Sequence, residues 1–298
     1  MNDDAVAPVV AAMLILAIVV TFFAAWNAYY VPSMKAQSEI THLKDVESGF
    51  LRFSSDIETA ASLKKSMRLS EPIPLGGGEF TFDAVKSGGT IRILGEKEGY
   101  MRLTVINGTI PETTSSILRF SNYSYQPVNN FWQDQGYVWS YGNVNVTKGT
   151  LSTPLQYASM DDVSYGVTGA LFDLDYVPSL GDPAKCSRMN VYAVNITPAV
   201  GHTLASGNGN GMLGLDSTVM SQQFANATSM TVRINPDMPT GFRNALWNSV
   251  NLRVNESLTC GNVHAFSDAP NLEVRVVFDT IPNMTLNRKT TEISLGAY

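Results

Sequence analysis

The feature that most limits how this chain can fold is a long uncharged run near its N-terminus. No charged residue occurs between Ala5 and Met34, and the stretch of 22 residues from Ala5 to Trp26 is interrupted only by Pro8 and Thr21. As a helix, this stretch would be about 33 Å long, which is enough to cross the hydrocarbon core of a bilayer. Because the run is apolar on every side, all of its faces need lipid or protein around them.

The start of this run is that of a helix and not that of a secretory signal peptide. Asp3 and Asp4 precede it, where acidic groups complement the helix dipole, and Pro8 is tolerated in a first turn. The run is too long, and its flank too acidic, for a signal peptide. Basic residues such as Lys35 follow it, and in an ordinary signal anchor they would keep the rest of the chain in the cytoplasm. A short basic leader that preceded Met1 and was removed would resolve this conflict.

After Pro32 the chain becomes amphipathic. Apolar residues recur at spacings of three and four, which is typical of one helical stripe: Ile40, Leu43, Val46, Phe50, Phe53, Ile57, Ala60, Leu63 and Met67. Because Pro32 cannot continue the hydrogen-bond ladder, we expect a kink near it. The helix should end before Pro72, so residues 1–70 are predicted to form an N-terminal hydrophobic and amphipathic helix. The stripe could pack on the chain's own globular part, and other faces of the same helix on neighbouring subunits.

The rest of the chain, residues 71–298, is predicted to be a β-rich head. Several short runs alternate between apolar and polar residues, as half-buried strands do: 79–83, 90–94, 101–105, 189–194, 230–234 and 272–276. Only Thr240 to Val250 suggests a further helix, and it is short. The predicted fold class is therefore α+β, with a long N-terminal helix followed by an antiparallel β-sandwich-like head.

Seven Asn-x-Ser/Thr sequons lie in the head, at Asn107, Asn122, Asn145, Asn195, Asn226, Asn255 and Asn283. On an extracellular surface several of them would carry N-linked glycans, although a composition rich in asparagine, serine and threonine also produces such motifs by chance. The two cysteines, Cys186 and Cys260, also lie in the head. In an exported domain a disulfide between them is favoured over two buried thiols.

Composition and motifs argue against several functional classes. The net charge of −6 is unsuited to general nucleic-acid binding, which needs a basic face. The three histidines, His42, His202 and His264, lie far apart, and neither an HExxH nor a GxSxG motif occurs. We therefore expect no enzymatic activity and no cofactor.

Two groups of residues have both a binding and a structural interpretation. Eight aromatic residues lie close together in sequence and could form a sugar-stacking platform, although core packing is favoured: Phe120, Tyr123, Tyr125, Phe131, Trp132, Tyr137, Trp139 and Tyr141. Asp173, Asp175 and Asp182 could bind calcium, but alternating acids on a strand are usually solvated.

The N-terminal string resembles that of a known family. The run Asp3-Asp4-Ala5-Val6-Ala7-Pro8-Val9-Val10, followed by an amphipathic helix and a β-rich head, is similar to archaeal type IV pilins, whose helix often opens with an Ala-Val-Ser-Pro-Val-Ile-like string. The resemblance covers about the first 35 residues closely and the remaining layout only generally. Ala7 stands where serine is frequent in the family.

This resemblance implies a structural subunit of an extracellular pilus, used for adhesion or surface attachment. Such subunits are stored in the membrane and then stacked through their apolar helices by a separate assembly ATPase and membrane platform. The assembly helix would present Val9, Leu14, Ile15, Ile18, Phe22, Phe23 and Trp26. An archaellum subunit is a less favoured variant. The alternatives are a non-polymerising single-pass or minor pilin-like surface protein, and an anchored carbohydrate-binding ectodomain or enzyme.

Overall fold

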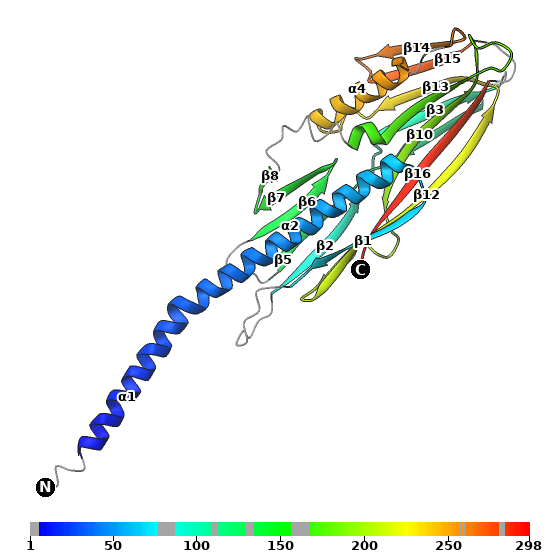
Figure 1. Ribbon diagram of the computed structural model, residues 1–298. Coiled ribbons are helices and arrows are strands. Elements are labelled where there is room, and N and C mark those ends of the chain that lie inside the picture. Colours follow the sequence, from blue (N-terminus) through cyan, green and yellow to red (C-terminus); the bar gives the residue numbers. More distant parts are fainter. Residues whose placement is uncertain are drawn as a thin grey trace.

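The structure is a computed structural model that describes residues 6–76, 87–108, 112–128, 134–155, 167–256, 258, 260–279 and 284–298. It is an elongated molecule in which one half of a long helix lies along a β-rich head and the other half projects away from it (Figure 1). The α+β prediction is confirmed at this level: one long N-terminal helix is followed by a region of several sheets.

The long helix contains a π-helical turn. It consists of α1 (Val6–Ala25), the π-turn η2 (Trp26–Tyr30) and α2 (Val31–Leu63). Because Pro32 has no backbone N–H and its ring displaces the carbonyl four residues earlier, the regular ladder is disturbed, and the N–H of Val31 bonds to the carbonyl of Trp26 instead. The helix changes direction at this point (Figure 1). The expected kink thus lies in the turn before the proline.

The helix ends earlier than the sequence indicated. Lys64 adopts a left-handed conformation with φ of 52° and closes α2 through its N–H and the carbonyl of Ala60, at 3.3 Å. The following segment is strand β1 (Met67–Pro74), not a helix to residue 70. Met67 continues the helical spacing only by coincidence. The prolines at 72 and 74 are accommodated because β1 lies at the edge of its sheet.

The head contains three sheets, whose strands are named below in the order in which they lie side by side. Sheet A comprises β1, β12 (Asn210–Ala225), β16 (Thr285–Ala297), β10 (Cys186–Pro198) and β9 (Phe172–Pro178). Sheet B comprises β11 (Leu204–Gly207), β2 (Gly88–Gly95), β5 (Ser121–Val128), β6 (Gln135–Ser140), β7 (Asn143–Lys148) and β8 (Leu151–Pro154). Sheet C comprises β14 (Val263–Asp268), β15 (Glu273–Phe278), β13 (Ala227–Ile234), β3 (Met101–Asn107) and β4 (Glu112–Leu118).

The strand pairing is mostly, but not wholly, antiparallel. Within the described residues the exception is β10 with β16, which run parallel over Arg188–Pro198 and Thr285–Leu295. The prediction of an antiparallel head is therefore wrong at this pair. The arrangement in three sheets does not confirm a two-layered sandwich.

The alternating runs at 90–94, 101–105, 189–194 and 230–234 all lie in strands, and 272–276 lies in β15 except for its first residue. The run at 79–83 lies outside the described residues. The predicted short helix is α4 (Thr240–Glu256), which buries one side chain per turn against the sheets: Phe242, Leu246, Val250 and Val254.

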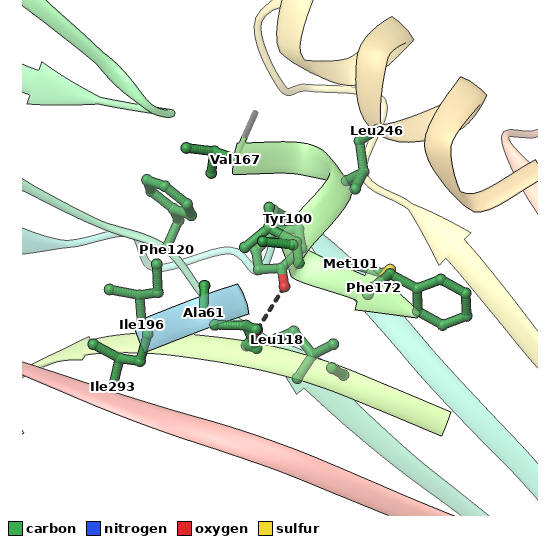
Figure 2. Close-up of a cluster of buried hydrophobic side chains, with 14 of the residues drawn as sticks. Ala61, Tyr100, Met101, Leu118, Phe120, Val167, Phe172, Ile196, Leu246 and Ile293 are labelled. Carbon is green, nitrogen blue, oxygen red and sulfur yellow. Dashed lines mark hydrogen bonds between the residues drawn. The ribbon is translucent and has the colours of Figure 1, made fainter. Parts of the chain in front are cut away.

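One continuous apolar core joins these elements. Figure 2 shows Ala61 from the end of α2 close to Ile196 and Ile293 of sheet A, with Leu118 of β4 nearby. The hydroxyl of Tyr100, fully buried in this cluster, donates to the backbone carbonyl of Val194. The end of α2 is therefore part of the head's core.

Candidate functional site

The candidate functional site is the projecting helix α1 together with its junction to the head. Every residue from 8 to 30 is exposed in the structure. The residues predicted to mediate assembly have exposed fractions between 41% for Trp26 and 68% for Ile18. That set is Val9, Leu14, Ile15, Ile18, Phe22, Phe23 and Trp26. So much apolar surface, present on all sides of the helix, is not compatible with water and requires a covering environment.

The composition of α1 suits an apolar environment. The helix from Pro8 is long and apolar enough to cross a membrane, and none of its apolar stretch is buried within the molecule. Its polar groups are satisfied internally, because Thr21 donates to the carbonyls of Ala17 and Ile18, both at 2.9 Å. Asn27 likewise donates to the carbonyl of Phe23 at 2.9 Å. Such internal bonding is what a helix in lipid or in an apolar bundle needs.

The apolar surface ends in a group of aromatic side chains at the π-turn. The rings of Phe22 and Trp26 are 6.2 Å apart, and those of Trp26 and Tyr30 are 4.3 Å apart. Tyr29 is 81% exposed. Tryptophan and tyrosine at the end of an apolar span are typical of the membrane–water interface, where each ring has an apolar body and a polar edge.

The stripe of α2 packs on the chain's own head. Six of its predicted members are buried: Leu43, Val46, Phe50, Phe53, Ile57 and Ala60. Ile40 is half-buried, Leu63 is 51% exposed, and Met67 belongs to β1. The interpretation that this stripe packs within the subunit is therefore confirmed. The helix also approaches β1 closely at Gly49, where a Cβ atom would lie 2.5 Å from Cδ1 of Ile73.

Hydroxyl and indole groups of sheet B fasten α2 along its length. Tyr137 donates to the carbonyl of Leu43 at 3.1 Å, and Tyr123 to that of Phe50 at 3.0 Å. The Nε1 of Trp139 donates to the side-chain hydroxyl of Ser54 at 2.8 Å. Burial raises the pKa of Tyr123 well above its ordinary value, so this phenol remains a donor throughout the physiological range.

A polar pair lies at the end of the junction nearest to α1. His42 is only 7% exposed, and its Nε2 lies 2.9 Å from the hydroxyl of Tyr125. That hydroxyl also donates to the carbonyl of Leu75 at 3.3 Å. Burial lowers the pKa of His42 below its ordinary value, although Asp45 and Glu39 oppose this shift. His42 is therefore neutral at pH 7 and contributes to docking.

The sequon asparagines differ in exposure. Asn226 and Asn255 are exposed, and Asn226 has a φ of 58° in the turn between β12 and β13, at the end of the head far from the N-terminus (Figure 1). Asn107, Asn122 and Asn195 are half-buried, and Asn145 is buried. Asn283 lies outside the described residues. Among the sequon asparagines that the structure describes, Asn226 and Asn255 are thus the exposed ones, and glycosylation itself stays a prediction.

The two cysteines lie together. Cys186 and Cys260 are 5.5 Å apart at Cα, within the range that a disulfide spans, and they are bonded in the structure. Asn262 reinforces the contact, because its side chain accepts from the N–H of Cys186 at 2.8 Å and donates to the carbonyl of the same residue at 3.0 Å. This link ties the start of β10 to the loop before β14.

The aromatic platform and the calcium site are not supported. Of the eight clustered aromatics, five are buried in the core: Phe120, Tyr123, Tyr125, Tyr137 and Trp139. Tyr141 is half-buried and stacks on Phe120 at 5.3 Å, while Phe131 and Trp132 lie outside the described residues. Asp173 pairs with Lys64 at 2.6 Å, and the described part of the chain contains no group of acids, histidines and cysteines suited to a metal.

Sequence reasoning missed two features of this site. The π-turn has no sequence pattern of its own. Pro32 indicates only that the helical hydrogen bonding is interrupted nearby. The polar junction at His42 has no local signal in the sequence, because its partner Tyr125 is 83 residues away. Comparisons of the chain with known protein families, with curated proteins and with solved structures found no match.

Proposed function

We propose that this chain is a structural subunit of an extracellular filament of the type IV pilus kind, assembled through α1 and used for adhesion or surface attachment. The observation that supports this most directly is the helix α1, which has apolar side chains on every face and is exposed at each of its residues from 8 to 25. Such a helix must be surrounded either by lipid or by copies of itself.

The junction of α2 with the head supports a rigid subunit. Because α2 is buried along the head and shares its core, a force on α1 is transmitted to the whole head and not absorbed in a linker. Stacking of the α1 helices would therefore place the heads in a defined array around a helical core. Asn226, in the turn between β12 and β13 at the distal end of the head, would then face solvent.

The energetics are compatible with movement between membrane and filament. Packing apolar helices together releases no new hydrophobic free energy relative to lipid, because lipid tails are as apolar as leucine. The two environments can therefore be close in free energy, and a cytoplasmic assembly ATPase with a membrane platform would drive the transfer. In this proposal the protein is not an enzyme, has no cofactor and does not bind nucleic acid.

The alternative is a surface protein that remains anchored as a single span, or a minor pilin-like subunit. The aromatic residues Trp26, Tyr29 and Tyr30 at the end of the apolar surface favour residence at a membrane interface, although storage before assembly would use them equally.

Shearing of cells separates the two functions. We expect this chain to appear in lipid-free fibres pelleted from the sheared supernatant, with residues 8–30 protected from protease and head loops cleavable. Fibres should persist on dilution, since loss of a subunit would expose α1 to water. Recovery of the chain in membrane vesicles alone, and as single copies in detergent micelles, would establish the anchored protein instead.

A further inference from the structure

A polar hollow of about 450 Å³ opens on the head between β4 and the strands β12, β16 and β10. This volume is within the range of about 300–1,000 Å³ typical of small-molecule sites. Half of its lining residues carry hydroxyl or amide side chains, and its charged residues are Arg288 and Glu292, both on β16. Arg288 lies opposite Gln222, and Glu292 opposite Asn195, on the neighbouring strands.

Arg288 is held in place by neutral partners. Its guanidinium donates to the side chain of Ser116 across the gap to β4, and to Oε1 of Gln222 at 2.5 Å. The ring of Phe224 lies 5.8 Å from its Cζ. Among the residues that the structure describes, no carboxylate oxygen lies within 4.0 Å of this guanidinium. The guanidinium is therefore held by neutral hydrogen-bond partners, and the nearby carboxylate of Glu292 acts on it only through space.

A half-buried charge that no carboxylate pairs with directly is unfavourable. Burial lowers the pKa of Arg288 below its ordinary value, and the carboxylate of Glu292 opposes this shift; the guanidinium stays protonated at any physiological pH. An anion in the hollow would offset this cost. The planar fork of an arginine matches a carboxylate better than any other side chain does.

The polar groups near Arg288 determine which other groups a ligand with an anionic group should carry. Glu292 accepts from Nδ2 of Asn195 at 2.5 Å, and Oδ1 of Asn195 accepts from the N–H of Arg119 at 2.7 Å. The carboxylate of Glu292 is a hydrogen-bond acceptor and repels a second negative charge. It therefore favours a ligand whose remaining polar groups are hydroxyl donors over one with several acids.

Apolar surface borders the same hollow. Ile117 is 39% exposed and Met220 is 61% exposed, and both belong to its lining. A sugar ring has this dual character, because its hydroxyls need donors and acceptors while its C–H face packs on apolar side chains.

We propose that this hollow binds the acidic residue of a saccharide, a hexuronate, with its carboxylate on Arg288 and its hydroxyls on Glu292 and Thr290. The site goes beyond the filament proposal and does not depend on whether the chain polymerises. It also differs from the aromatic platform considered from the sequence, five of whose members are buried in the core.

The test is titration of the full chain in detergent micelles, followed by isothermal calorimetry. D-glucuronate should bind saturably. D-glucose, which lacks the carboxylate, and acetate, which lacks the sugar ring and its hydroxyls, should each bind at least tenfold more weakly. Equal binding of glucose would overturn the role of Arg288, and equal binding of acetate would overturn recognition of the sugar. Stronger displacement of glucuronate by an aspartate-rich peptide would show that the site binds acidic peptide instead.

Substitutions connect the binding to the residues. Arg288→Gln should weaken glucuronate binding at least tenfold, Arg288→Lys should do so less, and Glu292→Gln should reduce the preference for glucuronate over acetate. Arg233→Gln removes an exposed arginine of sheet C and should leave binding unchanged. If Arg288→Gln fails to fold, the affinities of Arg288→Lys and Glu292→Gln for glucuronate test the proposal. Unchanged affinity in both of these folded variants would refute the proposal.

Discussion

A charge at the centre of α1 gives the sharpest test of its role. Ile15 lies at the middle of Val6–Ala25 and is 63% exposed, so Ile15→Asp places a carboxylate in whatever covers the helix. On insertion scales a charged residue at a helix centre costs about 2.5–3.5 kcal/mol. That corresponds to roughly a hundredfold loss in partitioning into lipid, and the same cost recurs for every subunit in a filament.

The head should be unaffected, because residue 15 belongs to the stretch that contributes nothing to the core. The matched control is Leu252→Asp, which adds the same charge to the exposed face of α4, where the leucine is 54% exposed. Both variants should therefore have the thermal unfolding midpoint of the wild type in detergent.

The assay compares the amount of chain in the membrane fraction and in sheared, lipid-free fibres. We expect Ile15→Asp to abolish fibres and to reduce the membrane fraction strongly, while Leu252→Asp behaves as wild type. Wild-type quantities of fibre from the Ile15→Asp chain would refute the reasoning, because α1 would then not be enclosed by apolar neighbours.

Three further predictions concern the junction and the head. Phe50→Ala removes a fully buried ring that lies 5.0 Å from that of Tyr123, and it should lower the free energy of unfolding by about 3–5 kcal/mol, whereas Phe22→Ala should leave it unchanged in a denaturant titration; equal effects would contradict docking of α2. Because the pKa of His42 is lowered in the fold, the unfolded chain takes up the proton first as pH falls below about 6.5, so stability should decline there and decline less in His42→Gln. If the stability of the wild type and of His42→Gln declined equally with falling pH, a neutral, buried imidazole at His42 would be contradicted. Reduction of the Cys186–Cys260 link, which joins residues 74 apart, should cost about 4 kcal/mol and add the mass of two hydrogens, so thiols that alkylate without reductant would disprove the link.

The parts of the fold that could be predicted are those set by local pattern. An uncharged run fixes α1, and spacing by threes and fours fixes the buried face of α2, because each face of a helix must match its surroundings. Alternation likewise located strands such as β3, where Met101, Leu103 and Val105 point inward. These signals depend on neighbours within one turn or one pleat.

What could not be predicted depends on partners far apart in sequence. Alternation in β10 and β16 is the same for parallel and antiparallel pairing, so the parallel ladder between Arg188 and Thr285 has no local signal. The hollow beside β4 is equally hidden, since the hydrogen bond from Arg288 to Ser116 joins residues 172 apart. In the sequence, Arg288 is one basic residue among 20.

The position of β16 in sheet A has a consequence for biosynthesis. This strand is the last in chain order, yet it lies between β12 and β10, and at its end Tyr298 and Met212 exchange backbone hydrogen bonds of 2.9 Å in both directions. Sheet A therefore cannot close until the ribosome has translated the chain at least as far as Ala297. At about 5–20 residues per second, α1 emerges some tens of seconds before that moment. The apolar helix is thus complete while the head is still open, so contact of α1 with a membrane can begin before the head folds.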